Sequence, residues 1–221
     1  MDLVSLRTFI RLSAVIEDTN ITNNQIATLI NQGYHELSII FPWPWLETTA
    51  DFTVGADVRS YDLPTNFDYG IAMIDTDTDR AIQHVAAKDF FERHGQDSST
   101  TSSAANFWTI YENKVYFTPV PSTATTAAYT LYYYKNITVL SGAGDEPAFH
   151  DAFHWALVEY AKWKLYDREE MFAQSERAFI TWTRYLNEML SWYASPVKKA
   201  PFIWGDGRTV RPFNNLTILD I

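Results

Sequence analysis

The stretch Phe41-Pro42-Trp43-Pro44-Trp45-Leu46-Glu47 marks a change from helical to extended patterning in the sequence. Proline disfavours helical backbone at the residue before it, so the two prolines end any helix that reaches this stretch. Apolar residues recur at helical spacing before it, whereas β-branched and aromatic residues typical of strands follow it. The stretch therefore predicts a boundary between a helical part, residues 1–45, and a β-rich part, residues 46–140.

Two helices are predicted before this boundary. The first is indicated by apolar residues at helical spacing, which are Leu3, Leu6, Phe9 and Ile10. The second begins at Thr22-Asn23-Asn24-Gln25, a capping box whose Thr and Gln side chains satisfy free amides at a helix start, and it extends to about Ile40.

The β-rich part contains an expected hairpin, Phe107 to Thr118, with its turn at Glu112-Asn113. A further strand, Tyr129 to Val139, alternates between two sets of residues: Tyr129, Leu131 and Tyr133 on one face, and Thr130, Tyr132 and Tyr134 on the other. A strand with rings on both faces is either sandwiched between layers or faces a partner.

Helical spacing returns after Ser141-Gly142-Ala143-Gly144 and continues from Phe149 to Tyr193, with Asp145 as the expected N-cap. Pro196 ends this pattern. Residues 141–195 therefore form a second helical part, and residues 196–221 an extended C-terminal tail. The fold class that we expect is α+β: a helical bundle built from the N- and C-terminal helices, with an inserted antiparallel β domain.

Composition excludes several classes of protein. The 221 residues include 17 Lys and Arg against 27 Asp and Glu, a net charge of -10, which disfavours a domain that grips nucleic acid through its phosphates. The absence of cysteine excludes thiolate catalysis and Cys-ligated metal centres. No stretch has the apolar length of a membrane-spanning helix, and the N-terminus does not resemble a secretion signal. The 8 Trp, 13 Tyr and 14 Phe exceed the needs of a core and suggest large interfaces.

Acidic residues concentrate between Glu47 and Asp79, where eight of them stand against one base. Within this segment Asp75, Asp77 and Asp79 are candidates for an acidic surface or channel wall. Their spacing imitates the start of a calcium loop, but Arg80 and Ala86 occupy the positions of its glycine and glutamate.

One pair of residues suggests an enzyme. His150 and His154 stand one helical turn apart, as in helices that bind zinc, and Glu169, Glu170 or Glu176 would have to supply a third ligand. A metal-dependent hydrolase using this pair is therefore an alternative function. Because Asp151 stands where such a motif needs Glu and no other catalytic pattern is present, we expect a protein that is not an enzyme and has no cofactor.

Partner contacts are expected at residues that a helical core does not absorb. Trp155 and Trp192 fall off or at the edge of the apolar stripe, and the C-terminal tail carries four bases against two acids together with several apolar residues. The candidates in this tail are Lys198, Lys199, Phe202, Trp204, Arg208, Arg211, Phe213, Leu216 and Ile218. A sugar-binding tail protein that stacks sugars on exposed rings is a second alternative.

The sequence resembles the head-to-tail adaptor, or connector, proteins of tailed bacteriophages, the group that includes tail tubular protein A. Order and spacing match from about residue 3 to 193, and the matching stretches are Phe41-Pro42-Trp43-Pro44-Trp45-Leu46-Glu47, Tyr61-Asp62-Leu63-Pro64-Thr65-Asn66-Phe67, Val115-Tyr116-Phe117-Thr118-Pro119-Val120-Pro121, Leu131-Tyr132-Tyr133-Tyr134, Glu146-Pro147-Ala148-Phe149-His150-Asp151-Ala152-Phe153, Ala156-Leu157-Val158-Glu159-Tyr160-Ala161 and Leu165-Tyr166-Asp167-Arg168-Glu169. Thr65-Asn66 departs from the family, in which an acidic residue often precedes the Phe, and the tail after Pro196 matches no family pattern.

The resemblance implies a virion protein, made in the host cytoplasm, that forms a ring of usually twelve copies between the portal protein and the tail nozzle or another tail protein. Genomic DNA would pass through this ring during ejection. Twelve copies would carry a charge of about -120, which would let DNA slide past without being held. We expect the helices to form the ring body and the tail to reach the portal or a neighbouring subunit.

Overall fold

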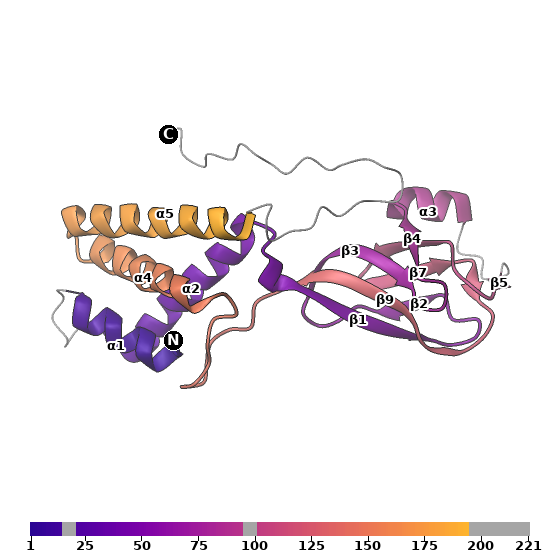
Figure 1. Ribbon diagram of the computed structural model, residues 1–221, viewed down its shortest axis with the longest axis horizontal. Coiled ribbons are helices and arrows are strands. Elements are labelled where there is room, and N and C mark those ends of the chain that lie inside the picture. The colour runs from indigo at the N-terminus through magenta and orange to yellow at the C-terminus, as the bar shows by residue number, and fades with distance from the viewer. Residues whose placement is uncertain (15–20, 95–100, 195–221) are drawn as a thin grey trace. The chain divides into compact units, whose positions relative to one another are not determined.

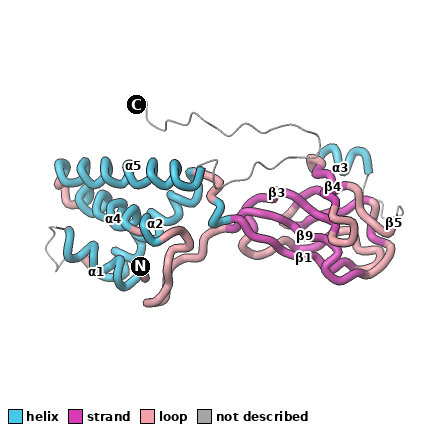
Figure 2. The backbone as a smooth tube through the Cα atoms, viewed as in Figure 1, coloured by secondary structure: helices cyan, strands magenta, loops and turns pink. Residues whose placement is uncertain are grey.

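The computed structural model describes residues 1–14, 21–94 and 101–194, and these divide into two compact units (Figure 1). The first unit contains Met1–Trp45 and the described residues from Thr138 onward; the second contains Leu46–Ile137. Figure 2 shows that the first unit is built from helices and loops and the second from strands with one helix.

The helical unit contains four α-helices within the described residues, and a short 3₁₀ turn, Asp151–Phe153, stands immediately before the third of them. The helices are α1 (Leu3–Ser13), α2 (Asn23–Ile40), α4 (Trp155–Arg168) and α5 (Phe172–Ala194). A second 3₁₀ turn, Pro44–Leu46, follows α2 and leads into the β unit.

The predicted capping box at the start of α2 is confirmed. The Thr22 hydroxyl accepts a hydrogen bond from the Gln25 amide at 3.2 Å, and the Gln25 side chain accepts one from the Thr22 amide at 2.8 Å. Helix α2 ends at Ile40, just before Pro42, as proline sterics require. The chain then buries Trp43, whose indole N–H donates to the carbonyl of Leu37 and so closes the end of the helix.

Helix α4 forms the middle of the helical unit. It packs against α5 on one side and against α1 and α2 on the other (Figure 1). One close approach is at Gly33 of α2, where Tyr160 of α4 lies so near that a Cβ at this position would stand 2.6 Å from the Tyr160 ring. On its other side the Tyr160 ring meets Trp182 of α5, with centroids 5.6 Å apart. Burial raises the pKa of Tyr160 to about 12.

The expectation that Asp145 caps the next helix is wrong. Its carboxylate instead accepts hydrogen bonds from the amides of Ser141 and Gly142, each at 2.7 Å, and closes the turn that contains them. Helix α4 begins only at Trp155. Asp prefers an N-cap in isolation, but it bonds equally well to free amides in a tight turn, and here the turn supplies them.

The β unit contains a seven-stranded sheet in the order β1-β9-β3-β4-β6-β7-β2. The strands are β1 (Glu47–Val54), β2 (Ser60–Asp62), β3 (Phe67–Asp75), β4 (Arg80–His84), β6 (Phe107–Tyr111), β7 (Lys114–Thr118) and β9 (Thr125–Lys135); β5 (Thr101–Ser102) and β8 (Val120–Pro121) pair separately, and α3 spans Ala87–His94. The predicted hairpin is β6–β7, with Glu112 and Asn113 at its turn in left-handed conformations.

The β unit differs from a purely antiparallel domain at two places, because β5 and β8 pair in parallel and so do two strands of the seven-stranded sheet. Strands β4 and β6 pair in parallel, because the connection between them contains α3 and is long enough to return the chain in the same direction. The inner face of the sheet carries the core of the unit, which includes Met73, Phe117 and Leu131, all fully buried. The alternation predicted for β9 is confirmed: Tyr129, Leu131 and Tyr133 are buried, whereas Tyr132 is exposed.

We expect Gly33→Ala to destabilise the helical unit. The added methyl would overlap the base of the Tyr160 ring, and overpacking costs about 1–3 kcal/mol, more than the roughly 1 kcal/mol that alanine gains in a helix. Urea unfolding measures the change. The matched control is Gly144→Ala, since no atom lies within 4 Å of a Cβ there. Equal stability of the two variants would contradict the close approach.

Candidate interaction surfaces

The two histidines of the possible zinc motif have separate structural roles. His154 is fully buried, with Nε2 3.0 Å from the carbonyl oxygen of Phe149 and Nδ1 2.7 Å from the backbone nitrogen of Met1. His150 is exposed, and its Nδ1 accepts a hydrogen bond from the Ala152 amide at 3.2 Å. Across residues 1–14, 21–94 and 101–194, no group of three His, Asp or Glu side chains is placed to hold a metal ion.

Burial of the His154 ring lowers its pKa below the ordinary 6.5. The neutral imidazole therefore dominates at neutral pH, with one nitrogen donating to the Phe149 carbonyl and the other accepting. The Phe149 ring also lies edge-on to the imidazole, with centroids 5.2 Å apart. Through these contacts His154 holds the start of α4 in place.

The three candidate acidic surface residues are in two different environments. Asp77 and Asp79 are exposed in the turn between β3 and β4. Asp75 is only 8% exposed, and its carboxylate accepts hydrogen bonds from the amides of Asp77 at 3.0 Å and Thr78 at 3.1 Å. Its assignment to an acidic surface is therefore a mistake: the side chain closes the turn, because carboxylates satisfy amides two and three residues along the chain.

Trp155 and Trp192 are partly exposed, at 37% and 45%, and each contacts other rings of the helical unit. The Trp155 ring lies 4.9 Å from that of Phe9, and the Trp192 ring lies 5.8 Å from that of His150. Every candidate beyond Ala194, from Lys198 to Ile218, lies outside the described part of the chain.

A first apolar surface lies on α1 and the start of α4. We call it the α1 surface, and it consists of Val4, Phe9, Leu12 and Trp155, all of which are exposed. Leu12 is the most exposed of the four, at 79%. The residues of α1 that point inward are Leu3, Leu6 and Ile10, so Phe9, which has helical spacing with them, lies at the edge of the core and not within it.

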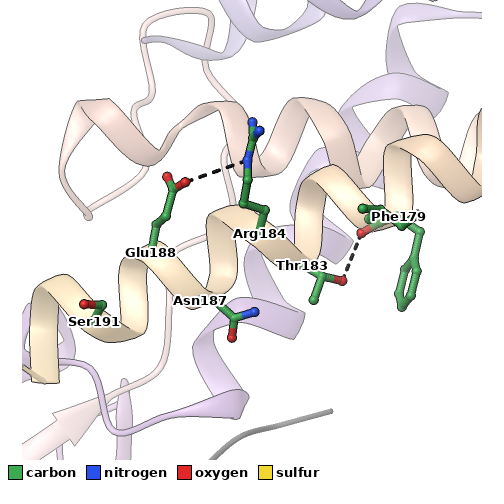
Figure 3. Close-up of a pocket in the computed structure, with 7 residues that line it drawn as sticks. Phe179, Thr183, Arg184, Asn187, Glu188 and Ser191 are labelled. Carbon is green, nitrogen blue, oxygen red and sulfur yellow. Dashed lines mark hydrogen bonds and ion pairs between the residues drawn. The ribbon is translucent and has the colours of Figure 1, made fainter. Parts of the chain in front are cut away.

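A second surface lies on the outer side of α5, where a shallow hollow of about 520 Å³ follows the helix (Figure 3). We call it the α5 surface; it is lined by Phe179, Ile180, Thr183, Arg184, Asn187, Glu188 and Ser191. Ile180 is 60% exposed. Arg184 and Glu188 stand on one side of the helix with their charged atoms 3.7 Å apart, whereas the Thr183 hydroxyl donates to its own helix at the Phe179 carbonyl.

Sequence analysis missed Leu12 and Ile180, although a signal was present. Both are large aliphatic residues outside the apolar stripe of their own helix, and such residues have no place in the core that the stripe builds. Single exposed apolar residues are ordinary on protein surfaces, so only their neighbours in the folded unit distinguish them.

A third surface is the outer face of the β unit, across β1, β9 and β3. We call it the tyrosine–carboxylate surface; it consists of Glu47, Asp51, Tyr69, Tyr132 and Tyr134. The rings of Tyr69 and Tyr134 are stacked with centroids 4.6 Å apart, and the Tyr134 hydroxyl donates to Glu47 at 3.0 Å. Burial first, and then the Glu47 charge, raise the pKa of Tyr134 far above its ordinary value, so its hydroxyl stays protonated.

The buried state of His154 predicts a pH dependence of stability. Because folding lowers the pKa of His154, its contribution is complete above about pH 6.5 and is lost as the pH falls through the folded-state pKa. We expect the free energy of unfolding to decrease between about pH 7 and pH 5, and to decrease less in His154→Gln. Denaturant titrations at each pH measure the slope. His150→Gln, at an exposed ring, is the control; an unchanged slope in His154→Gln would show that His154 does not carry the effect.

The sequence model of the family described as SU10 adaptor protein matches residues 1–200. No curated protein matches the sequence. Among the helices described, none is both long enough and apolar enough to cross a bilayer.

Proposed function

The chain belongs to the SU10 adaptor protein family, and on that premise we propose that it forms the ring that joins the portal of a bacteriophage to its tail. A structural role as a bacteriophage adaptor in the virion, in contact with portal and tail proteins, follows from the family. We propose further that the protein resembles tail tubular protein A and that DNA passes through the ring. The resemblance to the head-to-tail adaptors implies about twelve copies in this ring.

The observation that carries the ring is the pair of different apolar surfaces on the helical unit. The α1 surface and the α5 surface lie on opposite sides of α4, since α4 packs against α1 on one side and α5 on the other (Figure 1). The α1 surface projects Leu12, which is 79% exposed, whereas the α5 surface combines the exposed Ile180 with a shallow hollow. A projection on one copy that fits a hollow on the next makes a head-to-tail contact, which closes into a ring when the rotation between copies permits.

The charge of the protein suits a passage for DNA. Asp77 and Asp79 are exposed, and twelve copies at -10 would carry about -120. An acidic wall repels the phosphates, so DNA can move through without being bound. We propose that the helices form the body of the ring, that genomic DNA passes without specific contacts, and that residues 196–221 reach the portal or a neighbouring subunit.

Two alternative functions make different predictions. A hydrolase using His150 and His154 would bind zinc in stoichiometric amount, which metal analysis of the purified protein detects. A sugar-binding tail protein would bind glycans through exposed rings such as Tyr69 and Tyr132, which a glycan array detects. The family match and the two apolar surfaces favour the adaptor over both.

Charged substitutions on either apolar surface test the ring. We expect Leu12→Asp and Ile180→Asp each to weaken association at least tenfold, because each would place a carboxylate in a contact that excludes water. Sedimentation velocity and negative-stain imaging, with the protein alone and on its portal, measure the assemblies. Val58→Asp is the control, since Val58 is also an exposed aliphatic residue, at 42%, but lies in the β unit.

Mixing the two variants identifies the type of contact. Leu12→Asp keeps an intact α5 surface, and Ile180→Asp keeps an intact α1 surface, so the mixture can form one contact per pair and no ring. We therefore expect pairs in the mixture, with neither variant associating alone. Rings formed by either variant, or a mixture that stays monomeric, would contradict head-to-tail contact through these surfaces.

A further inference from the structure

The tyrosine–carboxylate surface has no covering layer among the described residues of its own unit. Tyr69 and Tyr132 are 46% and 43% exposed, on the face opposite the buried core. The register places Glu47 beside Tyr134, Thr49 beside Tyr132 and Asp51 beside Thr130, so carboxylates and rings lie in adjacent rows. The Thr130 hydroxyl donates to Asp51 at 2.6 Å, which fixes this carboxylate on the surface.

Acidic residues outnumber basic residues on the strands of this surface. Strands β1, β3 and β9 contain four acidic residues, Glu47, Asp51, Asp68 and Asp75, and a single base, Lys135. Asp75 is buried in its turn, which leaves the other three exposed. Lys135 follows Tyr134 and alternates to the inner side of the sheet. The outer face therefore combines aromatic rings with uncompensated negative charge.

Rings beside carboxylates suit cationic side chains. Lys and Arg lie over aromatic faces through cation–π attraction, and Arg also pairs with carboxylates through its planar guanidinium group. An anionic partner would be repelled by Glu47 and Asp51. The surface is thus fitted to a basic, partly aromatic peptide segment.

The chain contains one such segment at its C-terminus. Residues 196–221 carry Lys198, Lys199, Arg208 and Arg211 against two acids, and they also contain Phe202, Trp204 and Phe213. Residues 1–195 have the opposite sign, with a net charge of -12 by difference from the whole chain's -10. Twenty-six extended residues can span about 85 Å, enough to reach a neighbouring copy. The family match ends at residue 200, so most of this segment lies outside the matched part of the chain.

We propose that residues 196–221 of one copy bind the tyrosine–carboxylate surface of a second copy. Lys and Arg side chains of the segment contact Glu47, Asp51 and the open ring faces, and its aromatic residues pack beside Tyr132. The choice of a second copy over the same chain rests on the proposed ring, which holds neighbouring copies side by side. The contact would tie subunits together through a link separate from the α1 and α5 surfaces.

Introduced cysteines test this contact in the full-length chain, because the protein has no cysteine of its own. Thr49→Cys places a thiol on the surface opposite Tyr132, and Thr209→Cys places one next to Arg208. When the two substitutions are in separate chains of different size, a short bis-maleimide can join Thr49→Cys to Thr209→Cys only between copies. We expect the mixed cross-linked dimer to dominate.

The control replaces Thr49→Cys with Thr123→Cys, at a threonine that is also exposed and lies in the loop between β8 and β9. We expect at least a fivefold lower yield of mixed dimer with this control. We also expect a several-fold decrease when Arg208→Gln and Arg211→Gln are added to the Thr209→Cys chain. Raising salt from about 0.1 M to about 1 M should lower the yield as well, because the Debye length falls from about 10 Å to about 3 Å.

The outcomes separate this inference from the proposed ring. Rings in sedimentation and imaging without the mixed dimer would overturn the inference and leave the ring intact. The mixed dimer without rings would support the inference and contradict the ring. Cross-linking that occurs only when both cysteines are in one chain would overturn binding to a second copy, as would equal yields from Thr49→Cys and Thr123→Cys.

Discussion

Tyr160 lies between Gly33 of α2 and Trp182 of α5, and the arrangement of the helical unit depends on this contact. The missing side chain at Gly33 lets α4 approach α2 closely, and the other side of the same ring receives α5. Close packing of this kind leaves little freedom, because cores are as dense as organic crystals and lose stability when one methyl group is added.

The central position of α4 has a consequence for the outer helices. Helices α1 and α5 each have one side covered by the unit, and their other sides carry apolar residues such as Leu12 and Ile180. Burial of apolar area that is exposed to water stabilises a contact by about 25 cal/mol per Å². Two unlike surfaces of this kind on opposite sides of one unit favour addition of subunits in one direction, the geometry that a ring requires.

The β unit has a comparable asymmetry between its two faces. The inner face of β1, β9 and β3 is buried around Met73 and Leu131, while the outer face presents Tyr69 and Tyr132 to solvent. Both faces carry rings: Tyr129 and Tyr133 are buried with the aliphatic residues, whereas Tyr69 and Tyr132 are exposed beside carboxylates. Tyrosine suits a surface that is wet in one state and covered in another, because its ring is apolar and its hydroxyl is polar.

The sequence by itself determined those features that depend on neighbours along the chain: the capping box at Thr22, the end of α2 before Pro42, the hairpin turn at Glu112-Asn113 and the alternation of β9. Each follows from backbone sterics or from hydrogen bonds over a few residues. The same local rules were wrong for Asp145, because an amide-rich turn and a helix start offer an aspartate the same bonds. Only tertiary structure decided that Asp75 is buried, that His154 serves the core and that Leu12 and Ile180 are exposed on opposite sides of α4. Burial is a property of segments that are distant in the chain, and no spacing within one segment specifies which of its sides another will cover.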